Sequence, residues 1–411
     1  MTFHLANVAE SKLVSEYGSP LYVYQLDAVV AALADLRDAL PAEAALYYSL
    51  KANPHPQIAA TLREGDCHAE ISSEGELAAA RAAGFPGADC LYTGPAKSAE
   101  EIAAALDAGV TLFSVESSAD YRRVARAAAS AGKLARCLIR VSGSASGAAG
   151  LRMTGVSSQF GVDARELLAE PERFADVEGA QVVGAHFFPV SNVADEECLF
   201  GEVAGSIATA ARLRRETGLR LKQLDLGGGF AAPYAKPGAR PRYPTLRRRL
   251  EKVLDAHLPG WRDGSPLIAF ESGRHLVGGC GTLICSVADI KQRADRTFVL
   301  LDTGIHHLGG LSGLGRMLPD AAPVPVAESG EQTSTVTLAG PLCTPADVLS
   351  RSTRLAGLTP GDLLAFPNLG AYGLTASLIA FLSRPAPAEI VFRGEEPISA
   401  SRLRITRETI R

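Results

Sequence analysis

Short apolar runs alternate with alanine-rich stretches of helical character through about the first two thirds of the chain. Two segments, Ser73-Glu74-Gly75-Glu76 and Ser98-Ala99-Glu100-Glu101, have the form of capping boxes, which open helices. Strands and helices that alternate over roughly 250 residues are typical of a (β/α)8 barrel, and we expect that fold. The strand-like runs are Ala45–Leu50, Thr111–Val115, Cys137–Val141, Val182–Phe188, Gln223–Leu226 and Leu267–Glu271.

The rhythm changes after Gly273, where strand-like runs are separated by glycine, proline and polar turns. This second pattern predicts a mostly β domain. An early strand-like run, Leu21–Tyr24, precedes the first helix and could join either domain. We expect residues 1–26 to join the C-terminal β domain, residues 27–275 to form the barrel and residues 276–411 to form the β domain. The later runs are Leu276–Lys291, Thr297–Asp302, Ser334–Ala339, Asp362–Phe366 and Glu389–Phe392.

Composition excludes several classes of protein. The chain has 411 residues, of which 47% are hydrophobic and 21% charged, as in ordinary globular proteins of two domains. A net charge of -4 gives no indication of nucleic acid or membrane as a partner. Seven cysteines without a Cys-x-x-Cys pair argue against a disulfide framework or a zinc knuckle, and we expect no metal. Neither a signal peptide nor a membrane-spanning run is recognisable, so a cytoplasmic location is expected.

Lys51 ends the apolar, aromatic run Ala45–Leu50 and is followed by Asn53-Pro54 after one alanine. A strand with a lysine at its carboxyl end places an amine at the mouth of a parallel barrel, where such enzymes carry their chemistry. A partly desolvated amine there can lose its proton and form a Schiff base. Alternatively, Lys51 only extends its ammonium from the strand end into water, which is the commoner case for a single lysine.

Three glycines, Gly227, Gly228 and Gly229, follow the run Gln223–Leu226. Glycines let backbone N–H groups approach an anion closely, as in phosphate-binding loops. The spacing is neither that of a dinucleotide fingerprint nor that of a P-loop. Three glycines alone are more often a tight turn, so both interpretations stay open.

Glu271 and Arg274 lie three residues apart at the end of another strand-like run. They could form a local ion pair. They could instead face a ligand that carries a basic nitrogen and a phosphate, because a guanidinium binds two phosphate oxygens at once.

Two further positions lie in turns of the second domain. Cys343 stands in a loop bounded by Gly340-Pro341 and Pro345, and a free cysteine is usually a small buried hydrophobe. Tyr372 stands between Ala371 and Gly373, in a turn or as an exposed phenol.

In their order along the chain, these five motifs resemble the fold-type III pyridoxal 5'-phosphate (PLP)-dependent decarboxylases, the family of diaminopimelate, ornithine and arginine decarboxylases. The resemblance covers nearly the whole chain. It implies a PLP-binding (β/α)8 barrel of the alanine racemase-like type, followed by a C-terminal β domain. It also implies a homodimer in which each active site uses both chains.

The resemblance implies a role for each matching residue. Lys51 would form the Schiff base with PLP, and Glu271 would contact the pyridine nitrogen and keep the ring cationic. Cys343 would act on the substrate carbon from the neighbouring subunit, with Lys51 as the competing proton donor. The cofactor phosphate would be held by Gly227, Gly228, Gly229, Ser191, Arg274 and Tyr372. Glu76 also matches an acidic position of the family, but we assign it to helix capping.

The chain departs from the family pattern at two positions. The family usually shows His-x-His-x-Gly-Ser after the mid-barrel strand, and Phe188 stands here in place of the second histidine. A phenyl ring can stack on the cofactor but cannot carry a proton. Thr344 stands where diaminopimelate and ornithine decarboxylases have an acidic residue that reads the distal amine, so a diamino acid substrate is disfavoured.

The segment Asp302-Thr303-Gly304-Ile305-His306-His307, with Ser312-Gly313 and Cys343-Thr344-Pro345, is similar to a biosynthetic subgroup. That subgroup includes the butirosin-pathway decarboxylase, which acts on a glutamyl group tethered to an acyl carrier protein. His306 and His307 would then meet a non-cationic distal group, unless they simply face solvent. We therefore expect a cytoplasmic decarboxylase of specialised metabolism that acts on an α-amino acid, free or carrier-tethered.

Three alternatives remain. The first is a diaminopimelate decarboxylase. The second is a racemase on the same barrel, which Glu271 disfavours because racemases of this fold typically have an arginine at the ring nitrogen. The third is a PLP-binding regulator without catalysis, which only Phe188 favours.

Overall fold

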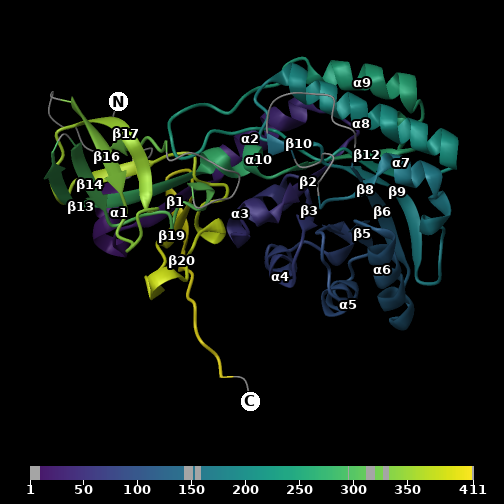
Figure 1. Cartoon of the computed structure of the whole chain (residues 1–411), viewed down its shortest axis with the longest axis horizontal. Coiled ribbons are helices and arrows are strands. Elements are labelled where there is room, and N and C mark those ends of the chain that lie inside the picture. The colour runs from purple at the N-terminus through teal and green to yellow at the C-terminus, as the bar shows by residue number, and fades with distance from the viewer. Residues whose placement is uncertain are drawn as a thin grey trace. The chain divides into compact units, whose positions relative to one another are not determined.

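The computed structural model describes residues 10–142, 151–152, 159–294, 296–311, 320–326 and 333–409 (Figure 1). The chain divides into two compact units. The barrel unit consists of Val30–Ala231 and Pro241–Leu276. The β unit consists of the described residues of Met1–Val29, Ala232–Arg240 and Val277–Arg411. The glycine- and serine-rich run 143–150 and the pair Ser312-Gly313 lie outside the described residues.

Eight parallel strands close into a barrel, which confirms the predicted fold. Each strand pairs in parallel with the next, and β12 pairs with β2 to complete the circle. Two of the strands, β3 and β4, were not predicted. The barrel strands are β2 (Ala45–Ser49), β3 (His68–Ile71), β4 (Cys90–Tyr92), β5 (Leu112–Val115), β6 (Ala135–Ser142), β9 (Ala180–Phe187), β11 (Gln223–Asp225) and β12 (Leu267–Ser272).

Apolar side chains from six strands fill the inside of the barrel. This packing makes the interior a solid core, so that ligands bind at its end rather than within it. The layer consists of Tyr47, Leu91, Leu112, Leu138, Val183 and Ala269, all of them buried.

The helices of the barrel unit begin at side-chain caps that the sequence partly predicts. Ser98 and Glu101 form a complete capping box at the start of α5, as predicted. Ser73 caps α4, but Glu76 accepts a hydrogen bond from the backbone N–H of Ser72 (2.7 Å) instead of that of Ser73. The longer helices are α2 (Leu26–Ala39), α3 (Pro56–Glu64), α4 (Glu74–Ala82), α5 (Ala99–Asp107), α6 (Ser118–Ser130), α7 (Ala164–Ala169), α8 (Glu196–Thr217) and α9 (Leu246–His257).

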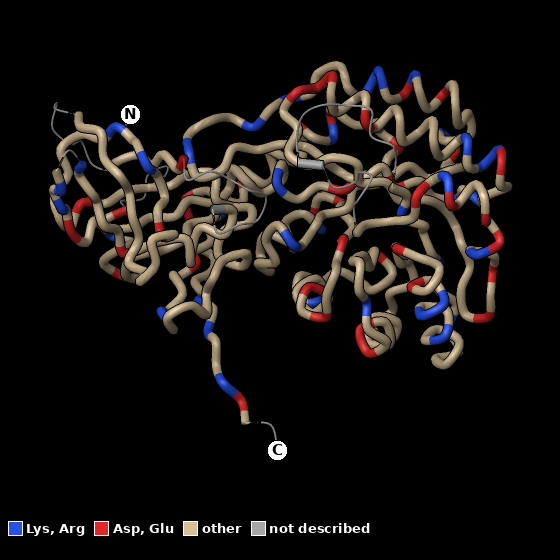
Figure 2. The backbone as a smooth tube through the Cα atoms, viewed as in Figure 1, with Lys and Arg blue, Asp and Glu red and all other residues tan. Residues whose placement is uncertain are grey.

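Charged residues of both signs recur along these helices (Figure 2). None of the helices in the described part of the chain is long and apolar enough to cross a membrane.

The β unit is built on a mixed sheet in the order β17-β16-β14-β13-β1-β19-β20. β1 lies between β13 and β19, so the N-terminal strand belongs to this sheet. The segment Leu276–Val277 is not strand, because it ends the short helix α10 (Arg274–Val277). The strands are β1 (Leu21–Gln25), β13 (Gly281–Arg293), β14 (Arg296–Leu301), β15 (Val324–Pro325), β16 (Thr333–Ala339), β17 (Val348–Ala356), β18 (Leu363–Phe366), β19 (Ala388–Arg393) and β20 (Glu396–Arg402).

The segment Ala232–Arg240 lies inside the range 27–275 that the sequence assigns to the barrel, yet its contacts place it with the β unit. The hydroxyl of Tyr234 donates a hydrogen bond to the carbonyl of Tyr372 (2.9 Å) and accepts one from the N–H of Gly310 (2.6 Å). This segment therefore supports the loop that carries Tyr372.

Candidate active site

Lys51 lies at the carboxyl end of β2, in the short 3-10 turn Leu50–Ala52. Its side chain remains 39% exposed, and its Nζ lies 2.7 Å from Oε2 of Glu70 in β3. β2 and β3 are parallel neighbours, so their carboxyl ends bring the two side chains together at one end of the barrel. The predicted amine at the barrel mouth is therefore present and is held by a carboxylate.

Glu70 is a site residue that the sequence interpretation missed. It is buried, and its Oε1 also accepts a hydrogen bond from the hydroxyl of Thr93 (2.5 Å). Burial opposes its ionisation, but the ammonium of Lys51 outweighs burial and lowers the pKa of Glu70. Polar and apolar residues alternate in His68–Ile71, and this pattern is the only sequence signal that could have indicated Glu70.

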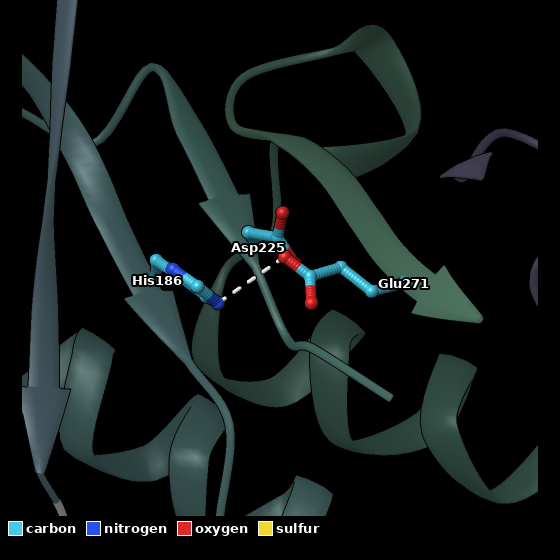
Figure 3. Close-up of side chains that lie close together, drawn as sticks. All are labelled: His186, Asp225 and Glu271. Atoms are coloured by element: carbon cyan, nitrogen blue, oxygen red, sulfur yellow. Dashed lines mark ion pairs between the residues drawn. The ribbon is translucent and has the colours of Figure 1, made fainter. Parts of the chain in front are cut away.

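Three buried side chains, His186, Asp225 and Glu271, point toward one another from the adjacent strands β9, β11 and β12 (Figure 3). Their ligand atoms all lie within 4.8 Å of one another, and Nε2 of His186 lies 3.3 Å from Oε1 of Glu271. In the parallel register, Asp225 pairs with His186, which explains why the side chains meet. Nδ1 of His186 is 2.7 Å from the hydroxyl of Ser114.

Three atoms of this cluster have no hydrogen-bond partner among the described residues: Nε2 of His186, Oδ2 of Asp225 and Oε1 of Glu271. Burial, followed by the negative charges of Glu70 and Asp225, raises the pKa of Glu271 well above its ordinary range. Burial raises the pKa of Asp225 to about 7 and lowers that of His186 well below its usual range. The imidazole is therefore neutral. For the two carboxyl groups, burial outweighs the N–H of Gly227 on Asp225 and the positive charges of Lys51 and Arg140.

A cavity of about 190 Å³ lies between this cluster and Lys51. Phe188 forms one wall, with Nζ of Lys51 5.7 Å from the centre of its ring. The guanidinium of Arg140 lies 4.7 Å from the ring centre of Phe160 and 5.9 Å from that of Phe188. An amine, an aromatic face and a buried carboxyl thus line one cavity.

Arg140 is a second residue that the sequence interpretation missed. It forms a buried ion pair with Glu116 (2.8 Å), and the other carboxylate oxygen of Glu116 accepts a hydrogen bond from the N–H of Gly161 (2.6 Å). Since the charge of Arg140 is paired and its guanidinium lies beside both aromatic rings, it fixes the position of the cavity wall.

The glycine run leaves no room for side chains. Gly227 and Gly229 have φ angles of +65° and +111°, which favour glycine. A Cβ at Gly227 would lie 2.2 Å from the carbonyl oxygen of Phe187, and one at Gly228 would lie 2.5 Å from that of Glu271. The turn therefore packs directly against the two strands that carry Phe188 and Glu271.

Replacement of Gly228 with alanine tests this close packing. Because the obstructing atom is a backbone oxygen, we expect Gly228→Ala to lower the stability of the protein by about 2 kcal/mol or more. Gly205 in α8 is the matched control, because a Cβ there meets no atom within 4 Å. Gly205→Ala should raise stability by about 0.5–1 kcal/mol through helix propensity, as measured by denaturant unfolding. Equal effects of the two substitutions would contradict the packing.

Asp225 gives the cofactor-free protein a pH-dependent stability. Because its pKa is raised to about 7 by burial, the folded chain keeps a proton that the unfolded chain releases above about pH 4. This contribution to stability is complete below pH ~4 and is lost as the pH rises through ~7. Asp225→Asn keeps this side chain uncharged at every pH and so removes the loss of stability. The melting temperature of the variant should therefore exceed that of the wild type by about 5 °C at pH 8, and by less at pH 5. Scanning calorimetry that finds the same difference at both pH values would rule this out.

Other predicted phosphate ligands lie in both units. Ser191 ends the short strand β10 (Val190–Ser191) and Arg274 begins α10, both half-buried in the barrel unit. Tyr372 lies in the β unit with a φ angle of +53°.

The β unit brings the remaining predicted residues together around Asp347. Its carboxylate accepts hydrogen bonds from the N–H groups of Ile305 and Leu342, each at 2.8 Å, and so ties the His306 loop to the Cys343 loop. Cys343 is exposed, unlike the other six cysteines. The hydroxyl of Thr344 lies 3.3 Å from the N–H of Ala346 and accepts a hydrogen bond from it.

The rings of His306 and His307 lie against each other within this arrangement, with ring centres 3.7 Å apart and their planes tilted by 38°. Both are buried, and burial lowers the pKa of His306 to about 4 and that of His307 to about 3. Nδ1 of His307 is 3.0 Å from the hydroxyl of Thr303, whereas neither ring nitrogen of His306 has a partner in the part of the chain that is described. The pair is therefore neutral at physiological pH, and its predicted contact with a substrate remains a prediction.

The parallel barrel carries an amine at its mouth, opposite a buried acceptor and beside an aromatic face. This arrangement is that of a PLP-dependent enzyme of the (β/α)8 class. The pyridoxal binding domain of the pyridoxal-dependent decarboxylases matches residues 26–278. The chain belongs to that family.

Two curated relatives align along most of the chain. It is 29% identical to the L-glutamyl-[BtrI acyl-carrier protein] decarboxylase of Niallia circulans, over 93% of this chain and 90% of the relative. It is 28% identical to the diaminopimelate decarboxylase of Aquifex aeolicus, over 94% and 90%. The crystal structure of the Helicobacter pylori diaminopimelate decarboxylase with L-lysine superposes with a TM-score of 0.81 at 25% identity, over 93% of this chain and 94% of that one.

The residues in the barrel fit the PLP that this family uses. Oε1 of Glu271 is a buried acceptor without a donor among the described residues, as a protonated ring nitrogen requires. The tight glycine turn adjoins the strand end that carries Glu271, and Phe188 offers a ring face. His186, Asp225 and Glu271 also have the ligand types of a divalent cation site, but the positive charges of Lys51 and Arg140 already act on Glu271.

Proposed function

We propose that this PLP-dependent amino-acid decarboxylase acts on an α-amino acid that lacks a distal ammonium group, either free or tethered to a carrier protein. The class of reaction follows from the family. The observation that carries the substrate proposal is the loop around Cys343, where Thr344 replaces the acidic residue expected for diamino acid substrates.

The chemistry of that loop supports a substrate without a second amine. Asp347 is the only acidic residue in 340–347, and both of its oxygens already accept backbone hydrogen bonds. The adjacent His306 and His307 are neutral, since burial lowers the pKa of each. A distal ammonium would find no acidic side chain among these residues that is free of backbone hydrogen bonds, whereas an amide or thioester would not need one.

Lys51 would hold the cofactor aldehyde, Glu271 its ring nitrogen, Phe188 its ring face, and the glycine turn with Ser191, Arg274 and Tyr372 its phosphate. When bound, PLP supplies an acceptor for the electron pair that is left as carbon dioxide departs. The carboxylate of Glu70 lies 2.7 Å from Nζ of Lys51 and would hold that side chain in position for the aldehyde.

The proton that replaces the carboxylate needs a donor near the substrate carbon. Phe188 cannot provide it, which leaves Lys51 and Cys343. We assign this role to Cys343, because it is the exposed cysteine of the chain and lies in a loop fixed by Asp347. In the proposed arrangement Cys343 reaches the site of a second copy in a cytoplasmic homodimer.

Carbon dioxide release from two substrates tests the substrate proposal. The purified protein is given L-glutamyl thioesters of pantetheine in one reaction and meso-diaminopimelate in the other. The proposal expects faster release from the thioester. Rapid turnover of diaminopimelate alone would refute the argument from Thr344 and support a diaminopimelate decarboxylase, which is the activity of several similar proteins.

A further inference from the structure

A groove of about 710 Å³ lies in the β unit between the extended C-terminal tail and the loop that precedes β19. We call it the tail groove. One side is formed by the tail after β20, and the other by the loop that includes Phe381–Ser383. It is lined by Ile379, Ala380, Ser383, Arg384, Pro385, Ala386, Arg402, Leu403, Arg404, Ile405, Thr406 and Arg407.

The tail groove is strongly basic, although the whole chain carries a net charge of -4. Four arginines line it and no acidic residue does. Arg402 and Arg384 bind backbone carbonyls, of Tyr17 and Pro341 respectively, and none of the four forms an ion pair within the described residues. Figure 2 shows the basic residues of the tail as blue segments near the C-terminus. Unpaired positive charge concentrated on one surface attracts an anionic partner.

Exposed apolar side chains are concentrated in and next to the two segments that form the tail groove, and two of them, Leu403 and Ile405, line it. Nine large apolar side chains are exposed in the described part of the chain, and six of them lie between residues 378 and 405. They are Leu378, Phe381, Leu382, Ile398, Leu403 and Ile405. Exposed apolar groups that surround polar ones are typical of an interaction site.

Arg384 connects the tail groove with the loops that carry the predicted substrate residues. Its guanidinium donates a hydrogen bond to the carbonyl of Pro341 (3.2 Å), two residues before Cys343. Burial lowers the pKa of His306 and of His307, and the positive charge of Arg384 lowers both further. A ligand in the groove would therefore lie beside the Cys343 loop.

We infer that the tail groove is the docking surface for an acidic carrier protein whose phosphate-linked thioester arm presents the amino acid. This inference rests on the proposed function in its carrier-tethered form. The arginines can bind both a phosphodiester and an acidic helix of the carrier protein. The exposed apolar side chains Leu403 and Ile405 can contact the aliphatic part of the arm. A small free amino acid would need neither a basic groove of this size nor exposed apolar side chains within it.

The test compares one substrate in two forms, L-glutamate as a thioester on the holo BtrI carrier protein and as a thioester on pantetheine, which lacks both protein and phosphate. The variant is Arg404→Glu with Arg407→Glu, because neither side chain makes a hydrogen bond or an ion pair within the described chain. Arg351→Glu, at an exposed position of β17, is the control for reversal of a single surface charge. Binding of fluorescently labelled holo carrier protein is measured in parallel, together with sedimentation of each variant.

We expect the double variant to lose about tenfold or more in kcat/KM and in affinity for the carrier protein, with less than about twofold change on the pantetheine thioester. Salt should weaken carrier binding to the wild type more than to the double variant. Unchanged carrier turnover and binding in the double variant would overturn the docking surface alone. No turnover of either thioester by the wild type would overturn the proposed function. Dissociation of an oligomer by the double variant would show instead that the groove contacts a second copy of the chain.

Discussion

Replacing Lys51 with alanine is expected to lower kcat by at least about 10³-fold and to abolish covalent retention of PLP. Lys51 is the amine that lines the cavity with Phe188 and Glu271, and its side chain is 39% exposed, so a small aldehyde can reach it. The imine absorbance of the purified protein should therefore disappear, and gel filtration should remove the cofactor.

Lys51→Arg is the matched control for folding. Arginine preserves a positive charge beside Glu70, where removal of the ammonium leaves a buried carboxylate without its ion pair. Because Lys51 is partly exposed, the alanine variant should lose only about 1 kcal/mol of stability and the arginine variant less. Both should lack activity, since arginine cannot form the imine. Retained turnover in either variant would contradict the role of Lys51.

Replacing Glu271 with glutamine is expected to lower kcat about 10²–10³-fold while PLP remains bound. Glutamine has the same volume but no negative charge, so the ring nitrogen would lose its proton more easily and the cofactor would withdraw electrons less strongly. The measurement is kcat per bound cofactor, counted by absorbance after denaturation in alkali.

Glu271→Asp separates charge from position. It keeps the carboxylate but withdraws it by one methylene, so we expect an activity between those of the wild type and the glutamine variant. Equal activity of the glutamine variant and the wild type would show that Glu271 does not act on the ring. Loss of cofactor from the glutamine variant would instead indicate a role in binding.

The barrel could be predicted because each of its signals, a short apolar run or a helix cap, lies within a few neighbouring residues. The complete capping box at Ser98 and Glu101 shows how directly such a signal corresponds to structure. β3 and β4 were not predicted. His68–Ile71 has a histidine and a glutamate among its four residues, so it lacks the apolar run by which the other strands were recognised. Their place in the sheet follows from pairing with β2 and β5.

The sequence indicated Lys51 and Glu271 because each lies at the end of an apolar run. It did not indicate Glu70, Arg140 or the cluster of His186 with Asp225, since those contacts depend on which strands are neighbours. The pairing of Asp225 with His186 joins residues 39 positions apart, and no local pattern specifies it. The shifted pKa values of Asp225 and Glu271 likewise arise only once burial is known.

Phe188 departs from the family pattern, and the structure places its ring in the wall of the cavity with Lys51 and Glu271. Stacking of this ring on the cofactor stays a prediction. A phenyl ring carries no titratable proton, and the neutral, buried His186 lines the same cavity beside Ser114 and Glu271.

We expect one amine, that of Lys51, to hold PLP covalently opposite Glu271. Reduction of the purified protein with borohydride fixes the cofactor to its amine, and peptide mass spectrometry then identifies the modified residue. We expect a single pyridoxyl-phosphate adduct on the peptide that contains Lys51. An adduct on another lysine, such as the buried Lys97, or no adduct on a protein that releases carbon dioxide, would contradict the account.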